Sequence, residues 1–294
     1  MENIILEPEI YYGSRGADFK SLINNLLIKG KIKQKYIDIL LNETNMKLYG
    51  NMFTSDLVDP VNNYQYYETI GDAVAGNFIV NYSFRRFPFI KSAEGVQIAA
   101  AIVIEYGAKK TFNKISEDLG FWPFITSTME SRNRNKIDLL EDVFEAFIGG
   151  TSTILDDQIK NGVGYAICYD ILKNIFDNIE MDLRYEVLFP AKTRLKELFD
   201  VYKELGQLKY EESYFTNHLG HRITISIVYK VDQRTGARVE LGRGVGAIKD
   251  SAQPKAAQEA YLSLTSKGYK KTRAPIYEYI DEMYKQDNNF FTNV

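Results

Sequence analysis

The sequence has few of the residues on which many enzymes depend. It contains one cysteine and two histidines, and both histidines lie after residue 217. The lone Cys168 excludes a disulfide within the chain. The lack of earlier histidines excludes a His-activated nucleophile or a His-ligated zinc site in the first two hundred residues. If that region is catalytic, carboxylates must do the work.

Long apolar runs are also missing. The longest, Ile98 to Ile104, is far shorter than the roughly 20 residues that a membrane-spanning helix needs. The opening residues, Met-Glu-Asn-Ile-Ile-Leu-Glu-Pro, have neither the basic start nor the apolar stretch of a signal peptide. Together with the single cysteine, these observations predict a cytoplasmic protein in a reducing compartment, with no membrane partner.

Acidic residues, in contrast, occur in two pairs at helical spacing. Glu68 and Asp72 are four residues apart, and Asp142 and Glu145 are three apart. Residues at these spacings share one face of a helix. Either pair alone is typical of a solvated helix face, but two such helices side by side would bring four carboxylates together. Hard oxygen ligands of this kind select Mg²⁺ or Mn²⁺.

The residues around the two pairs carry a family resemblance. Tyr-Glu-Thr-Ile-Gly-Asp-Ala-Val at 67–74 resembles the ribonuclease III signature, and Glu-Asp-Val-Phe-Glu-Ala-Phe-Ile-Gly at 141–149 resembles the second acidic helix of that family. The resemblance implies a homodimer that uses Mg²⁺, with Mn²⁺ as a substitute, and no organic cofactor. It assigns Glu94 as a candidate accessory acid. The catalytic and metal-binding acids that it implies are Glu68, Asp72, Asp142 and Glu145.

The length of the chain and the change from helical to strand patterns along it predict two domains of an α+β protein. Apolar residues recur at helical spacing up to residue 183, which predicts an all-α ribonuclease III endonuclease domain at 1–183. Within it, the polar and basic stretch 126–136 is expected to be a surface loop. Strand patterns at 210–215, 222–231 and 238–242 lie between helices at 190–198 and 252–266. A Gly-rich turn is expected between residue 242 and the second of these helices.

This α-β-β-β-α order, over 189–268, resembles the double-stranded-RNA-binding domain. Residues 189–270 contain 14 Lys and Arg against 9 Asp and Glu, although the whole chain has a net charge of −3. A basic module suits a nucleic-acid partner. The remaining stretch, 269–294, is a C-terminal tail in which a helix is expected after Pro275. The resemblance implies RNA contacts by Lys192, Thr193, Lys196, Glu197, His218, His221, Arg243, Lys249 and Lys255.

Some positions depart from the family patterns. Asp250 and Gln253 stand where cations are usual at the start of the last helix of the module, so RNA affinity should be weakened; the alternative is a protein–protein module that has lost RNA binding. In the first domain Gln65 replaces an acid, and Thr69 replaces the aromatic that fills the dimer centre. Tyr64, Tyr66 and Tyr67 are the candidates to pack that centre instead.

The resemblance therefore predicts a Mg²⁺-dependent endoribonuclease that cleaves double-stranded RNA to 5′-phosphate and 3′-hydroxyl ends with short 3′ overhangs, in RNA processing or degradation. One alternative stays open. It is a catalytically weak or inactive protein that binds double-stranded RNA, either sequestering it or serving as a ribonucleoprotein scaffold.

Overall fold

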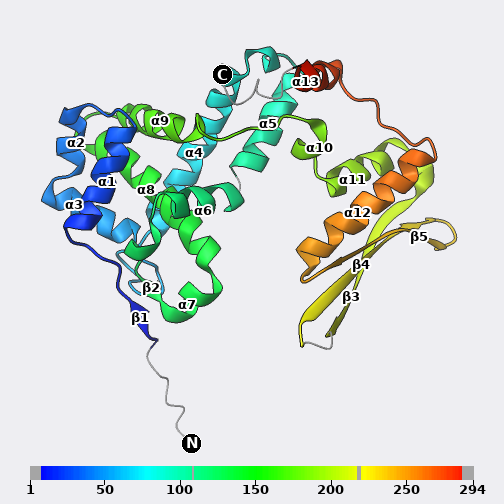
Figure 1. Ribbon diagram of the computed structural model, residues 1–294, viewed down its shortest axis with the longest axis horizontal. Coiled ribbons are helices and arrows are strands. Elements are labelled where there is room, and N and C mark those ends of the chain that lie inside the picture. Colours follow the sequence, from blue (N-terminus) through cyan, green and yellow to red (C-terminus); the bar gives the residue numbers. More distant parts are fainter. Residues whose placement is uncertain (1–7, 108, 217–219, 287–294) are drawn as a thin grey trace, which may run out of the picture. The chain divides into compact units, whose positions relative to one another are not determined.

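The computed structural model describes residues 8–107, 109–216 and 220–286 (Figure 1). Within these ranges the chain forms two compact units, of which the first ends at Met181 and the second begins at Asp182. We describe each unit by itself.

Unit 1 is built around α8, a helix that is apolar on nearly every side. From Leu139 to Leu155 most of its side chains are buried, as expected for a helix surrounded by others. Its most extensive neighbour is α4, which packs along it. The helices of unit 1 are α1 (Ala17–Lys29), α2 (Gln34–Leu40), α3 (Glu43–Met52), α4 (Gln65–Arg86), α5 (Gly95–Tyr106), α6 (Lys109–Asp118), α7 (Met129–Arg134), α8 (Lys136–Gln158) and α9 (Val163–Phe176), with 3₁₀ turns η1 (Pro88–Ile90) and η2 (Trp122–Phe124).

The expectation of an entirely helical first domain was wrong in one detail. Strands β1 (Ile10–Tyr11) and β2 (Ser127–Thr128) form a short antiparallel pair. The segment 126–136 is therefore not a loop, because β2 is followed directly by α7. The Thr128 side chain caps this helix by accepting a hydrogen bond from the Ser131 N–H at 3.1 Å.

A buried arginine explains why this basic segment is not the surface loop that its composition predicts. The guanidinium of Arg132 lies between the rings of Tyr11 and Trp122, 3.8 Å from each centroid. It also donates to the carbonyl oxygens of Ile125 and Trp122. A charged side chain that is stacked and hydrogen-bonded in this way can be buried at low cost, which composition alone does not reveal.

Unit 2 has two helices on one face of a three-stranded antiparallel sheet (Figure 1). The core lies between them and includes Leu195, Leu198, Val228 and Ala256. The observed order is α-β-β-β-α, as predicted. The elements are α10 (Tyr185–Leu188), α11 (Ala191–Val201), η3 (Lys203–Leu205), β3 (Gln207–Thr216), β4 (Arg222–Val231), β5 (Arg238–Gly246) and α12 (Lys249–Ser266).

The glycines of β5 allow α12 to lie close against the sheet. A Cβ at Gly242 would come within 2.5 Å of the Ala260 nitrogen, and one at Gly244 within 2.1 Å of the Ala252 oxygen. This stretch is thus part of a strand rather than the turn expected after residue 242. The helix also starts earlier than expected, at Lys249, which puts Pro254 in its second turn and leaves no helical N–H at that position.

The tail forms the predicted helix, α13 (Pro275–Gln286), and this helix belongs to unit 2. The ring of Tyr277 packs edge-on against Tyr185 at 5.0 Å, and the Leu183 N–H donates to the Tyr284 hydroxyl at 2.9 Å. The helix thus packs against the segment that opens unit 2.

Two further expectations concern the whole chain. Cys168 is buried, and its Sγ lies 3.3 Å from the Ile148 carbonyl oxygen, in keeping with a structural side chain. None of the helices in the described ranges is long and apolar enough to cross a membrane.

Candidate active site

The two acidic pairs lie on α4 and α8 where these helices approach most closely. A Cβ built on Gly71 would lie 1.8 Å from the carbonyl oxygen of Glu145, and one built on Gly149 would lie 2.0 Å from that of Tyr67. Both distances are far below van der Waals contact, so only glycine fits at either position. The backbones therefore meet directly, and the first pair faces the second.

The four predicted acids differ in their exposure. Glu145 is buried, with 7% of its surface exposed, although it carries an ionisable group. Glu68 and Asp142 are half-buried, and Asp72 is exposed. The site thus runs from the protein interior to its surface.

Crowding and burial change the protonation of these acids. Burial, followed by repulsion from Glu141, Asp72, Glu68 and Asp142, raises the pKa of Glu145 to about 8. Burial and the charge of Asp142, with smaller contributions from other acids, raise the pKa of Glu68 to about 7. Burial also raises the pKa of Asp142 to about 6, against the opposing effect of a hydrogen bond from Tyr64. The structure therefore brings the charges of all four acids close enough to act on one another.

Two residues from the part of α4 and its N-cap that departs from the family pattern, Tyr64 and Gln65, interact with this acidic cluster. Tyr64 is buried and its hydroxyl bonds to Asp142, so it faces the acids of its own chain and is not available to pack a dimer centre. Gln65 donates from Nε2 to Asp56 at 3.0 Å, and the charge of Asp56 in turn acts on Glu68. The amide at position 65 thus holds another carboxylate beside the site.

A cation and a fifth acid that sequence reasoning missed flank the cluster. Lys109 Nζ lies 2.6 Å from Asp138 and 2.9 Å from Glu141. Burial raises the pKa of Glu141, while Lys109 acts in the opposite direction. A spacing of four residues from Glu145 could have identified Glu141, but Lys109, on α6, carries no sequence pattern that would.

The donor set suits a divalent cation. All four groups offer carboxylate oxygens, and their mutual repulsion is relieved when a hard cation is bound. In the described ranges, no three acidic, histidine or cysteine side chains are yet arranged to hold one ion together. Rotation of the carboxylates would be needed to close the site, and Asp72, which is exposed, has room for it.

Other residues singled out from the sequence lie elsewhere. Glu94 is exposed at the N-cap of α5 and is not among the charges that shift the pKa of Glu68, Asp142 or Glu145. Thr69 is exposed, and its hydroxyl donates to the Gln65 carbonyl. The structure does not bring either residue into the cluster.

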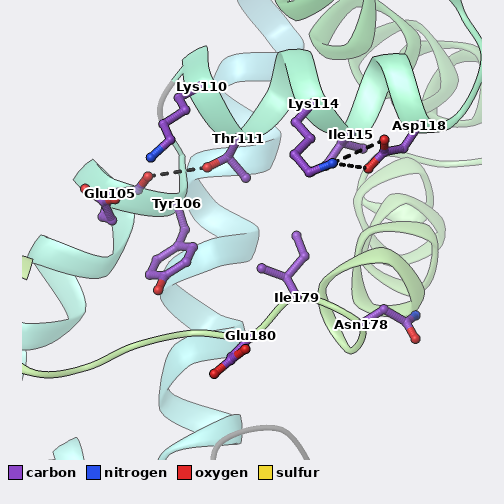
Figure 2. A pocket seen from close by; sticks show the side chains of 10 residues that line it. All are labelled: Glu105, Tyr106, Lys110, Thr111, Lys114, Ile115, Asp118, Asn178, Ile179 and Glu180. Atoms are coloured by element: carbon purple, nitrogen blue, oxygen red, sulfur yellow. Dashed lines mark hydrogen bonds and ion pairs between the residues drawn. The ribbon is translucent and has the colours of Figure 1, made fainter. Parts of the chain in front are cut away.

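A separate hollow of unit 1 lies between α5, α6 and the segment 178–180 (Figure 2). None of the four clustered acids lines it. Lys114 and Asp118 on its rim pair with each other at 2.9 Å, and Thr111 donates to the Glu105 carbonyl. Because the crowded acids with raised pKa values lie elsewhere, we place the site at the acidic cluster and not here.

The predicted RNA-contacting residues on α11 lie on its surface. Lys192, Thr193 and Lys196 are exposed. The Lys192 ammonium donates to Gln253 at 2.6 Å, and Gln253, which is buried, donates to Glu212 at 2.5 Å. Gln253 is therefore an internal link between helix and sheet rather than a lost surface cation.

Several of the other predicted contacts already have partners within unit 2. Glu197 accepts from the Tyr185 hydroxyl at 2.6 Å and pairs with Lys271 at 2.9 Å. Arg243 pairs with Glu240, and Lys255 donates to the Val245 carbonyl. Three further residues were predicted: Lys249 and His221 are exposed, and His218 lies outside the described residues.

Comparisons with known proteins agree with this geometry. The family model described as "Ribonuclease III domain" matches residues 65–153, which contain all four clustered acids. A protein of Invertebrate iridescent virus 6 named "Putative ribonuclease 3" is 36% identical over 283 residues, which is 91% of this chain and 95% of the relative. This chain belongs to the ribonuclease III family. Its enzyme class is that of the family, an endoribonuclease.

Further bacterial and viral ribonuclease III proteins are similar to this chain over most of its length. Ribonuclease 3 of Geobacillus sp. (strain WCH70) is 32% identical over 266 residues, or 87% of this chain and 99% of the relative. The Frog virus 3 "Putative ribonuclease 3" is 37% identical over 84% of this chain, which spans 63% of that longer relative. A solved nuclease domain of ribonuclease III from Campylobacter jejuni covers 61% of this chain at 20% identity and a TM-score of 0.40, with 99% of that domain matched.

Proposed function

We propose that this chain is a Mg²⁺-dependent endoribonuclease that cleaves double-stranded RNA to 5′-phosphate and 3′-hydroxyl ends with short 3′ overhangs. The proposal rests above all on one observation. Four carboxylates converge at the contact of α4 with α8, and three of them have raised pKa values. Such crowding is unfavourable in a merely structural helix pair and is useful in a site for divalent cations.

The roles of the side chains follow from their positions. Asp72 and Glu145 would hold the metal directly, and Glu68 and Asp142 would share ligation and orient water. The Tyr64 hydroxyl lies beside Asp142 and opposes the rise of the pKa of that acid. Bound Mg²⁺ lowers the pKa of a water molecule and stabilises charge on the phosphate and on the leaving 3′ oxygen.

We infer that unit 2 binds the duplex. It is the basic part of an otherwise acidic chain, and its α-β-β-β-α order resembles the double-stranded-RNA-binding domain. Duplex RNA is recognised mainly by shape, through 2′-hydroxyls of the minor groove and the phosphates beside it. Lys192 and Lys196, four residues apart on the exposed side of α11, are suited to phosphates of that kind. Sequence preference should therefore be slight.

We also propose a homodimer in which Tyr66 replaces the missing aromatic of position 69. Of the three candidate tyrosines, Tyr64 is buried against its own acids and Tyr67 is half-buried. Tyr66 is 61% exposed, and its ring contacts that of Tyr67 at 5.1 Å. An exposed aromatic held by a neighbouring ring is a suitable contact for a partner subunit.

The test is cleavage of an end-labelled, perfectly paired RNA of about thirty base pairs, with Mg²⁺ and with chelator, beside a single-stranded control. We expect duplex-specific cutting that needs Mg²⁺ and is lost in Glu145→Gln. Glu130→Gln is the matched control, because Glu130 is an exposed carboxylate of unit 1 paired with Arg134. Binding without cutting by the parent protein would instead support the sequestering or scaffold function.

A further inference from the structure

Four cations fall within seven residues between α12 and α13. They are Lys267, Lys270, Lys271 and Arg273, and no acid occurs from residue 260 to residue 277. Lys267 lies at the end of the predicted RNA-binding module, 189–268, and the other three follow it; none of the four is among the RNA contacts described above.

The backbone of this segment is fixed to the body of unit 2. The Tyr202 hydroxyl donates to the Lys270 carbonyl oxygen at 2.9 Å, and the Lys270 N–H lies 3.3 Å from the same hydroxyl. The rings of Tyr202 and Tyr269 meet edge-on at 5.1 Å, and both pack on the core between sheet and helices. The position from which Lys270 extends is therefore set by the fold.

Three of the four cations line one hollow. We call it the basic hollow; it is lined by Tyr261, Thr265, Lys270, Lys271 and Arg273. A phosphate group would find both positive charge and hydrogen-bond donors there.

Three acids form ion pairs with two of the three cations that line the basic hollow. Lys271 pairs with Glu197, and Arg273 pairs with Glu186 and, at 3.6 Å, with Asp281. Among the ion pairs of the described ranges, none involves Lys267 or Lys270. The three acids thus equal the three lining cations in formal charge, and Lys270 is the lining cation that lies outside these ion pairs.

The hollow adjoins the surface of α11 on which RNA is expected. Glu197 lies near the middle of that helix, and its ion pair with Lys271 brings the basic segment against α11. Lys271 thus lies beside Glu197, which is itself one of the predicted RNA contacts. A duplex lying on α11 would continue toward the basic hollow.

We propose that Lys270, Lys271 and Arg273 form a second phosphate-binding surface, which holds the sugar–phosphate backbone of duplex RNA beyond the footprint of α11. The inference rests on the proposed binding of duplex RNA by unit 2. Contacts of this kind position a duplex without reading its sequence. Lysines at such a surface release counterions when RNA binds, so each contact contributes to the salt dependence of affinity.

The experiment measures the affinity of the full chain for a thirty-base-pair RNA duplex, with chelator present, as a function of salt. The test variant is K270Q/K271Q. The matched control is K209Q/R238Q, which removes the same charge from two exposed residues that both pair with Glu211. Lys209 alternates along β3 with Leu208 and Tyr210, which pack on the core, so it lies on the sheet face away from the helices.

We expect K270Q/K271Q to lower the slope of log affinity against log salt by about 2, since each phosphate contact contributes roughly 0.9, and the control to keep the slope of the parent. The single variant K270Q, which leaves the Lys271–Glu197 pair intact, should lower the slope by about 1. Equal slopes for test and control variants would overturn this inference alone. Failure of the parent protein to bind duplex would overturn the proposed binding function and this inference with it.

Discussion

Lys109 Nζ lies 2.9 Å from Glu141 Oε2, at the edge of the acidic cluster. Glu141 is the largest charge contribution to the raised pKa of Glu145, so its own neutralisation matters for the whole site. The lysine comes from α6 and the acid from α8. A cation from α6 thus reduces the negative charge of a site that α4 and α8 form.

Removing this cation should strengthen metal binding. In Lys109→Gln the cluster gains one net negative charge at close range, and we expect Mn²⁺ to bind more tightly by on the order of 1 kcal/mol, or a few-fold. Lys114→Gln is the control, because Lys114 lies on the same helix and pairs with the exposed Asp118. Calorimetric titration with Mn²⁺ measures the effect. Equal affinities for the two variants would contradict it.

The metal-free protein should become less stable as pH rises, because the buried acids then lose their protons and become charged. Glu145 has a pKa of about 8 when folded, well above the value of about 4.5 for an exposed Glu, so the folded state binds more protons between these values. Stability therefore falls as pH rises from about 5 to 8. In Glu145→Gln the fall should be smaller. Thermal unfolding in chelator at several pH values tests this, and an unchanged slope in the variant would contradict it.

The close contact of α4 with α8 should not tolerate even a methyl group. We expect Gly71→Ala to lower the free energy of unfolding by about 1–3 kcal/mol and to remove activity, because the new Cβ meets the Glu145 carbonyl oxygen. The control lies on the same helix: a Cβ at Gly76 has no atom within 4 Å. Gly76→Ala should raise the free energy of unfolding by about 0.5–1 kcal/mol. Denaturant unfolding compares the two.

The proposed dimer contact predicts that a substitution at Tyr66 changes the mass of the assembly in solution. If Tyr66 packs against a partner subunit, Tyr66→Ala should shift sedimentation from dimer toward monomer at micromolar concentration. Tyr12→Ala is the control, since Tyr12 is also strongly exposed in unit 1, at 72%. A parent protein that sediments as a monomer would refute the proposed dimer itself.

The acids could be predicted because their chemistry depends on spacing. Periodicity predicts that Glu68 shares a helix face with Asp72, and Asp142 with Glu145. The set of four is implied by the family resemblance, and the structure packs α4, which carries the first pair, on α8, which carries the second. Their companions could not be found in this way. Lys109 is 32 residues from Glu141 in sequence and reaches it only through the packing of α6 on α8.

Local propensity was least informative where tertiary contacts override it. Composition predicts that Arg132 lies in a polar loop, yet it is enclosed by the ring of Tyr11, from a distant segment, and by that of Trp122, in the 3₁₀ turn η2. The glycines of β5 were read as a turn, but α12 needs them for close packing against an extended strand. In both cases the deciding partner lies far away in the sequence or in another element.

The contact between Gly71 and the Glu145 carbonyl also limits how the site can respond to its ligands. Because main-chain atoms already touch, a bound ion cannot draw the two helices nearer. Any adjustment to an ion of different radius must come from side-chain torsions of the acids alone. The spacing of the two helices is therefore constant, and ions of different radius are accommodated by different rotamers of the acidic side chains.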